Sequence, residues 1–183
     1  TYIDHNLFSS SLNFAVCAPN TLFFMIFIIG AATMGTPAEQ PVYELLDHFD
    51  NIEIRRYQPM ILAVTHSVDA DGLDRLYGYN GNGFDRLSGY IFGDNKDNHK
   101  IAMTKPIANR ITEDGWQTAI MMPSQYRLDQ LPRPTDDSVY FVEVPERTIV
   151  ALMFSGWANT MAVNTHHKQL EHFLREQGYA TTG

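Results

Sequence analysis

The sequence predicts an α+β fold, in which an antiparallel or mixed sheet wraps into an incomplete barrel flanked by two helices. Over most of the chain apolar residues alternate with polar ones, and this period of two changes to three and four only near residues 82–93 and 160–178. The order strand, proline-bearing turn, strand, helix also occurs twice, starting at Ile52 and again at Val139. The composition, with 44% hydrophobic and 19% charged residues, is typical of a globular chain. Two related halves of this kind would close a sheet around the helices.

The first half is predicted to contain three strands and a short helix. Residues 43–46 and 52–57 form the first two strands, and residues 61–68 form a third strand after a proline. The helix is predicted to begin at Asn82, which can serve as its N-cap, and to end at Gly93.

The second half is predicted to repeat this order. A helix over residues 161–177 follows the strands and ends at Gly178. The last two strands are expected to pair with each other across a proline-bearing turn. The strands of this part of the chain are predicted at residues 100–107, 117–122, 138–144 and 148–154.

Residues 1–40 differ from the rest of the chain and are interpreted as an extension. Residues 22–29 are an unbroken apolar run, too short to span a bilayer as a helix but as long as the core of a signal peptide. Residues 1–21 contain no Lys or Arg, which such a signal would carry, so a spurious extension and a packed core strand are the alternatives. An export signal would be removed near Thr33 and would place the protein in the periplasm or outside the cell; otherwise the protein would be cytoplasmic. The folded domain is expected over residues 41–183.

Charge and cysteine content exclude several classes of function. The net charge of −8 argues against nucleic-acid binding and against electrostatic docking on anionic lipid. The only cysteine, Cys17, can form no intrachain disulfide, and CxxC metal sites are excluded for the same reason. The sequence has no HExxH, GxSxG, GxGxxG or P-loop pattern. It therefore predicts a binding protein rather than an enzyme, without a stable membrane span.

Seven short stretches in a fixed order carry a resemblance to a known family. Residues 52–59, IEIRRYQP, are similar to its EIRxYxP segment, residues 84–95, FDRLSGYIFGDN, to its GFxxLxxYIxGxN helix, and residues 100–107, KIAMTKPI, to its KIxMTxPV strand. The other four stretches are residues 41–44, 122–126, 131–134 and 154–156. On these motifs the chain resembles the SOUL family of haem-binding proteins.

The resemblance implies a distorted β-barrel of two related halves flanked by two helices. It also implies reversible binding of haem or another tetrapyrrole in a hydrophobic groove beside the first helix. The family chain continues after its second helix into further strands, so this chain is expected to be truncated at its C-terminus. Arg56 stands where some members carry a histidine proposed to ligate haem, and Lys105 replaces a small residue.

Haem requires a flat apolar slot, positive charge for two propionates and, optionally, an axial ligand. The residues expected to line the slot lie on the first helix and are Phe84, Leu87, Tyr90 and Ile91. Plain core packing is the alternative for each of them. The residues expected near the propionates are Arg86, Lys96, Lys100 and Lys105. Ordinary solvated surface is the alternative for these four.

The sequence leaves the axial ligand open. Met103 offers a thioether to the cofactor, although methionine is also a common core filler. His167 and Glu171 are four residues apart on one helical face, either as a metal site or as an exposed polar face. The seven histidines are His5, His48, His66, His99, His166, His167 and His172. Binding without an axial ligand is a further alternative.

The sequence therefore predicts a non-catalytic protein that binds haem or a related tetrapyrrole as a carrier or buffer. The alternative is an effector-binding module for another apolar small molecule, since a barrel of two related halves could offer the same groove. A haem-dependent enzyme is a third class, for which the sequence contains no proton-transfer constellation.

Overall fold

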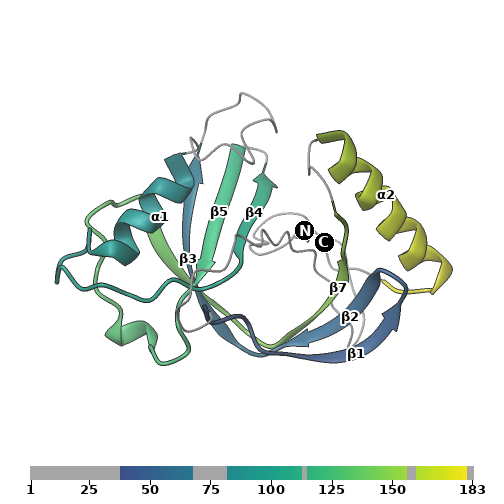
Figure 1. The fold of residues 1–183 in the computed structure, drawn as a ribbon, viewed down its shortest axis with the longest axis horizontal. Helices are drawn as coiled ribbons and strands as arrows, with labels where there is room; N and C mark the ends of the chain where they lie inside the picture. Colours follow the sequence, from purple (N-terminus) through teal and green to yellow (C-terminus); the bar gives the residue numbers. More distant parts are fainter. Residues whose placement is uncertain (1–37, 68–81, 113–114, 156–159, 181–183) are drawn as a thin grey trace.

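The structure is a computed structural model that describes residues 38–67, 82–112, 115–155 and 160–180 (Figure 1). In these residues two α-helices and two antiparallel sheets form an α+β fold, as the sequence predicts. The strands are β1 (Tyr43–Phe49), β2 (Ile52–Tyr57), β3 (Met60–Ser67), β4 (Ile107–Thr112), β5 (Gly115–Met121), β6 (Val139–Val144) and β7 (Arg147–Leu152). The helices are α1 (Asn82–Phe92), α2 (Thr160–Glu176) and the short 3-10 turn η2 (Leu128–Gln130).

The strands form two separate sheets. One has three strands in the order β1-β2-β7, and the other has four in the order β4-β5-β3-β6. Figure 1 shows α1 and α2 on the outer sides of these sheets, at opposite ends of the molecule. All strand pairs among the described residues are antiparallel, so of the two predicted arrangements the antiparallel one is confirmed and the mixed one is not. These residues form no closed barrel, and the barrel stays a prediction.

The chain passes between the two sheets at two prolines. β2 pairs with β7 and β3 pairs with β6, so the prediction that residues 138–144 and 148–154 pair with each other is wrong. A two-residue hairpin turn needs a positive φ, which Asp50 (φ 57) supplies between β1 and β2. Pro59 and Pro145 instead hold φ at about −65°, so at these connections the chain does not reverse into a hairpin. The repeated order of strand, strand, helix is confirmed by β2-β3-α1 and β6-β7-α2.

Each helix covers one sheet and shares a core cluster with it. α1 packs on the four-stranded sheet through Leu87, Tyr90 and Ile91, and α2 packs on the three-stranded sheet through Leu170 and Leu174. A third cluster joins residues of both sheets, and its buried members are Tyr57, Leu62, Val64, Ala108, Ala119, Met121, Val144, Ile149 and Ala151. The three- and four-residue spacing of the apolar side chains on the two helices therefore marks their buried faces.

The predicted strand over residues 100–107 is wrong for all but its last residue, where β4 begins. The backbone N–H of Ile101 donates to the carbonyl of Ile91 at the end of α1 (2.8 Å). The N–H of Lys105 donates to the carbonyl of Glu39 (2.8 Å). These bonds draw the segment out of the sheet ladder and lay its start beside the end of α1.

The other predicted strands and helices agree with the structure to within three residues at each end. Gly93 (φ 122) and Gly178 (φ 70) follow α1 and α2 with the left-handed backbone that was expected at helix ends. The predicted apolar run at residues 22–29 and the processing point near Thr33 lie outside the described residues. Within the described part of the chain, no helix combines the length and the apolar character that crossing a membrane requires.

Candidate functional site

Three of the predicted slot residues lie on the buried side of α1. Leu87, Tyr90 and Ile91 are at most 1% exposed and pack against the four-stranded sheet. The hydroxyl of Tyr90 donates to the carbonyl of Pro132 (2.9 Å), and burial raises the pKa of this hydroxyl. A ligand could touch these side chains only if α1 moved away from the sheet. They are part of the core here, and their contact with haem stays a prediction.

The other predicted site residues are more accessible. Phe84 is half-buried in the first turn of α1. Met103 is 40% exposed and Lys105 is half-buried, and both lie in the segment that follows α1. Met103 and Lys105 thus lie in the segment whose start is bonded to the last turn of α1. Phe84 lies at the other end of this helix, in its first turn.

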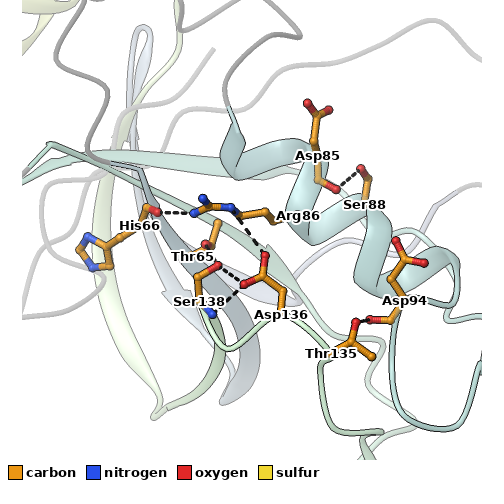
Figure 2. A network of polar contacts seen from close by, with 9 residues as sticks. All are labelled: Thr65, His66, Asp85, Arg86, Ser88, Asp94, Thr135, Asp136 and Ser138. Carbon is orange, nitrogen blue, oxygen red and sulfur yellow. Dashed lines mark hydrogen bonds and ion pairs between the residues drawn. The ribbon is translucent and has the colours of Figure 1, made fainter.

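A polar network holds the first turns of α1 against the sheet (Figure 2). Nη1 of Arg86 donates to the carbonyl of His66 (3.0 Å), and Nε of Arg86 lies 3.6 Å from Oδ2 of Asp136. The same carboxylate accepts from the hydroxyl (2.6 Å) and the backbone N–H (2.9 Å) of Ser138. The bonds from Ser138, and to a lesser degree the charge of Arg86, hold the pKa of the Asp136 carboxyl below its ordinary value. Arg86, which was predicted to meet a propionate, is therefore engaged in positioning α1.

The loop after α1 is fixed by contacts with the segment that precedes β6. The carbonyl of Asp94 accepts from the hydroxyl of Thr135 (2.7 Å), as Figure 2 shows. The N–H of Lys96 donates to the carbonyl of Arg133 (2.9 Å). Both ends of α1 are thus anchored by polar contacts to residues that are distant in the sequence.

Asn95 organises the loop between α1 and Ile101. This residue is 2% exposed, and its Nδ2 donates to the carbonyls of Tyr90 (3.0 Å) and His99 (2.7 Å). Its Oδ1 accepts from the N–H of His99 (3.0 Å). Asn98, at φ 49, makes the turn that brings the chain back, and its N–H donates to the carbonyl of Asn95 (3.1 Å). The backbone of His99 is therefore held on both sides, while the residue itself is exposed.

Four exposed residues lie close along the chain to the point where Ile101 bonds to Ile91. Phe92 is 61% exposed and Met103 is 40% exposed. Both lie within two residues of the bonded pair along the chain, as do His99 and Lys100, which are also exposed. We call this set the α1-end surface, and it consists of Phe92, His99, Lys100 and Met103.

His99 has an aromatic partner from another part of the chain. Its Nε2 lies 2.9 Å from the hydroxyl of Tyr126, and the two rings meet edge to face with centroids 6.3 Å apart. Sequence reasoning did not select Phe92 or Tyr126 as site residues. The only signal for Phe92 was its place outside the three- and four-residue spacing of the buried face, and no sequence signal joins Tyr126 to His99.

The other possible metal ligands lie away from this surface. On α2, Nε2 of His167 lies 3.1 Å from Oε1 of Glu171, and Nε2 of His172 lies 3.2 Å from Oε1 of Glu176. No group of three or more His, Cys, Asp or Glu side chains suited to a metal ion occurs in the described ranges. The pairing of His167 with Glu171 is therefore the i, i+4 contact of a polar helix face, which was the alternative interpretation.

Comparison with known proteins identifies the family. The model of the SOUL haem-binding protein family matches residues 38–183. The chain belongs to the SOUL family. Heme-binding protein 2 of Mus musculus is 26% identical to it over 153 residues, which cover 76% of this chain and 71% of that protein. Heme-binding protein 2 of Homo sapiens is 27% identical over 135 residues, which cover 69% of this chain and 62% of that protein. The SOUL match includes every described residue, so the resemblance drawn from the motifs is confirmed.

Proposed function

We propose that this chain binds haem or a related tetrapyrrole reversibly and without catalysis, as a carrier or buffer. The observation that carries the proposal is the match of the SOUL family model to residues 38–183. Two relatives that are named for haem binding support it. Bound haem would supply its iron and its flat apolar ring, while the protein would supply apolar contact, positive charge and a fixed position.

The proposed binding surface is the α1-end surface, because its side chains fit haem in chemical kind. Phe92 and Met103 offer exposed apolar contact to a porphyrin face, which gains about 25 cal/mol for each Å² of apolar area removed from water. Lys100 is exposed beside them, and Lys96 and Lys105 lie in the same stretch of chain as partners for propionates. Two of the predicted site residues, Met103 and Lys105, therefore belong to this proposal as direct contacts.

The buried side of α1 would contribute by keeping this surface in shape. Leu87, Tyr90 and Ile91 hold the helix on the sheet, and the network of Arg86 and the loop around Asn95 fix its two ends. A surface that is ordered before the ligand arrives loses less conformational freedom on binding. Phe84, in the first turn, would touch the ligand only if it extended along the helix.

Titration of the full-length chain with ferric haem tests the proposal through the Soret band. We expect a saturable shift, and Phe92→Asp or Met103→Asp should weaken binding at least about tenfold, roughly 1.4 kcal/mol. The added carboxylate would remove apolar contact and repel the propionates. Both side chains are exposed, so these variants should fold, which circular dichroism would verify.

Met161→Asp is the matched control, since Met161 is a 79% exposed methionine on α2. It should bind haem as the wild type does. Equal weakening by Met161→Asp would contradict the proposed surface. If the wild type gave no saturable shift, haem binding would be ruled out and the alternative of an effector-binding module would gain support.

We also propose that residues 22–29 act as an export signal that places the mature protein in the periplasm or outside the cell. The length of the apolar run and the small residues after it support this proposal. N-terminal sequencing of the protein from its native host tests it, and a start near Thr33 is expected. A cytosolic product that retains residues 1–27 would contradict it.

A further inference from the structure

One histidine of the α1-end surface has a fixed backbone and an exposed side chain. The N–H and the carbonyl of His99 are both bonded to the side chain of Asn95, at 3.0 and 2.7 Å. Asn95 is itself 2% exposed and also donates to the carbonyl of Tyr90 at the end of α1. The position of His99 is thus tied to the helix, and a ligand that approached this surface would meet an imidazole held at a set place.

The imidazole of His99 carries the kind of partner that orients a metal ligand. A histidine that binds a metal commonly has its second ring nitrogen in a hydrogen bond, which fixes the tautomer and the ring plane. Here one ring nitrogen, Nε2, lies 2.9 Å from the hydroxyl of Tyr126. This contact engages Nε2 and leaves Nδ1 as the ring nitrogen for a metal.

We propose that His99 coordinates the iron of bound haem and that Tyr126 positions its ring. The assignment rests on the proposed function, since it concerns the same surface and the same ligand. Phe92 and Met103 are exposed and, like His99, lie within two residues of the bonded pair Ile91 and Ile101, so the proposal brings all three against one porphyrin. Coordination would leave the protein unmodified and would require no electron transfer.

The other described histidines are less suited to this role by their positions. His167 and His172 pair with glutamates on α2, and His166 stacks on Phe154 with ring centroids 4.2 Å apart. His66 contacts Gln117 through Nε2 (2.8 Å), and His48 lies on the edge strand β1 of the three-stranded sheet. None of these five belongs to the α1-end surface. The competing ligand within that surface is Met103, through its thioether.

The experiment compares iron-containing and iron-free porphyrin on the full-length chain. Ferric haem and protoporphyrin IX are titrated into the wild type, His99→Ala and the control His172→Ala, whose imidazole is exposed on α2. We expect His99→Ala to change the Soret position and the spin state seen by electron paramagnetic resonance. It should weaken haem binding at least about tenfold and leave the affinity for protoporphyrin IX unchanged within about twofold. Tyr126→Phe should alter the spin-state mixture while haem still binds.

The outcomes separate this inference from the proposed function. If the wild type binds haem and His99→Ala has an unaltered spectrum, the assignment of His99 is wrong while haem binding stands. If His99→Ala weakens both porphyrins equally, His99 is a packing contact and not an iron ligand. A spectral change in Met103→Leu without one in His99→Ala would assign the iron to Met103 instead. If the wild type binds neither porphyrin, the proposed function itself fails.

Discussion

The two helices lie on comparable sheets but are held in different ways. α1 has three side chains that are at most 1% exposed and polar anchors that reach residues distant in the sequence, such as Asp136 and Thr135. α2 is held by Leu170 and Leu174 and by the ring of Phe173 against that of Phe49 (5.0 Å between centroids). Its two histidine–glutamate pairs join residues of the helix itself. Hydrogen bonds have preferred distances and angles, so polar contacts at both ends define the position of a helix more narrowly than apolar packing alone. The proposed ligand surface thus lies at one end of the helix that makes directional bonds to residues distant in the sequence.

The strands that the two helices cover differ in how many neighbouring strands they pair with. β3, under α1, is paired on both edges, with β5 and with β6. Its counterpart in the repeat, β7, is paired with β2 and with no second strand of the described ranges. The α1 half thus has more of its backbone hydrogen bonds satisfied by neighbouring strands, and we expect it to be the more resistant half to local opening.

The largest expected effect on stability comes from truncating a buried leucine under either helix. Leu87 and Leu170 are both 0% exposed, one on each helix. Leu87→Ala and Leu170→Ala should each lower the free energy of unfolding by about 2–5 kcal/mol, because apolar burial is lost and a cavity remains. Urea denaturation followed by circular dichroism measures both. In amide hydrogen exchange, the backbone amides of α1 should stay protected in Leu87→Ala, whereas those of α2 should lose protection in Leu170→Ala. Equal loss of protection in both helices would contradict the expected difference between them.

The next effect concerns two asparagines, one in the loop after α1 and one in the turn between β1 and β2 of the sheet that α2 covers. Asn95→Ala removes a buried side chain that holds the backbone on both sides of His99, and should cost about 2 kcal/mol because buried groups lose their partners. Asn51 donates a single exposed bond to the carbonyl of Met153 (3.1 Å), so Asn51→Ala should cost about 0.5 kcal/mol. Thermal and urea unfolding of the two variants side by side would check this order. The reverse order would mean that the loop after α1 is not a structural anchor.

A smaller effect is expected from the anchor at the start of α1. Arg86→Met keeps most of the apolar stem but removes the bond to the carbonyl of His66 and the ion pair with Asp136. Since the arginine side chain is 35% exposed, water screens the pair, and the loss should be about 1 kcal/mol. Glu176→Gln, which breaks the exposed pair with His172 on α2, should cost about 0.3 kcal/mol. Equal losses would show that the polar contacts of α1 contribute no more than those of α2.

The sequence was sufficient for elements that depend on local pattern. The alternation of β2 and the spacing of Leu87 and Ile91 identified a strand and the buried face of a helix, because both follow from side-chain direction alone. The pairing of strands was not predictable in this way. Residues 138–144 and 148–154 look like a hairpin, but β6 pairs with β3 and β7 pairs with β2, and these partners lie far away in the sequence.

The sequence selected candidate site residues around α1 but not the contacts that arrange them. The resemblance pointed to the surroundings of α1, and Met103 and Lys105 do lie in the segment pinned beside its end. The bond between Ile101 and Ile91 places the segment after α1 beside the end of the helix, and the ring partner of His99 is Tyr126, 27 residues further along the chain. Both are tertiary contacts, which periodicity and motifs do not encode.

The smallest expected effect concerns the titration of Asp136. The bonds from Ser138 lower the pKa of this carboxyl, so Ser138→Ala, which removes the hydroxyl donor at 2.6 Å and keeps the backbone donor, should raise the pKa part of the way toward 3.8. A pKa that is lower in the folded state stabilises the fold above the unfolded value, and this stabilisation is lost as the pH falls through the folded value. The wild type should therefore be slightly more stable than Ser138→Ala at pH 7, and the difference should vanish in acid below the folded pKa. Since the carboxylate side chain is 46% exposed, the difference should stay under about 0.5 kcal/mol. Carboxyl NMR titration of both proteins measures the pKa directly. If Asp136 titrates at the same pH in both, the hydroxyl of Ser138 does not set its pKa, and the backbone N–H of Ser138 and the charge of Arg86 are the remaining causes. Added salt then separates these two, because it screens the charge of Arg86 and should raise the pKa only if that charge is the cause.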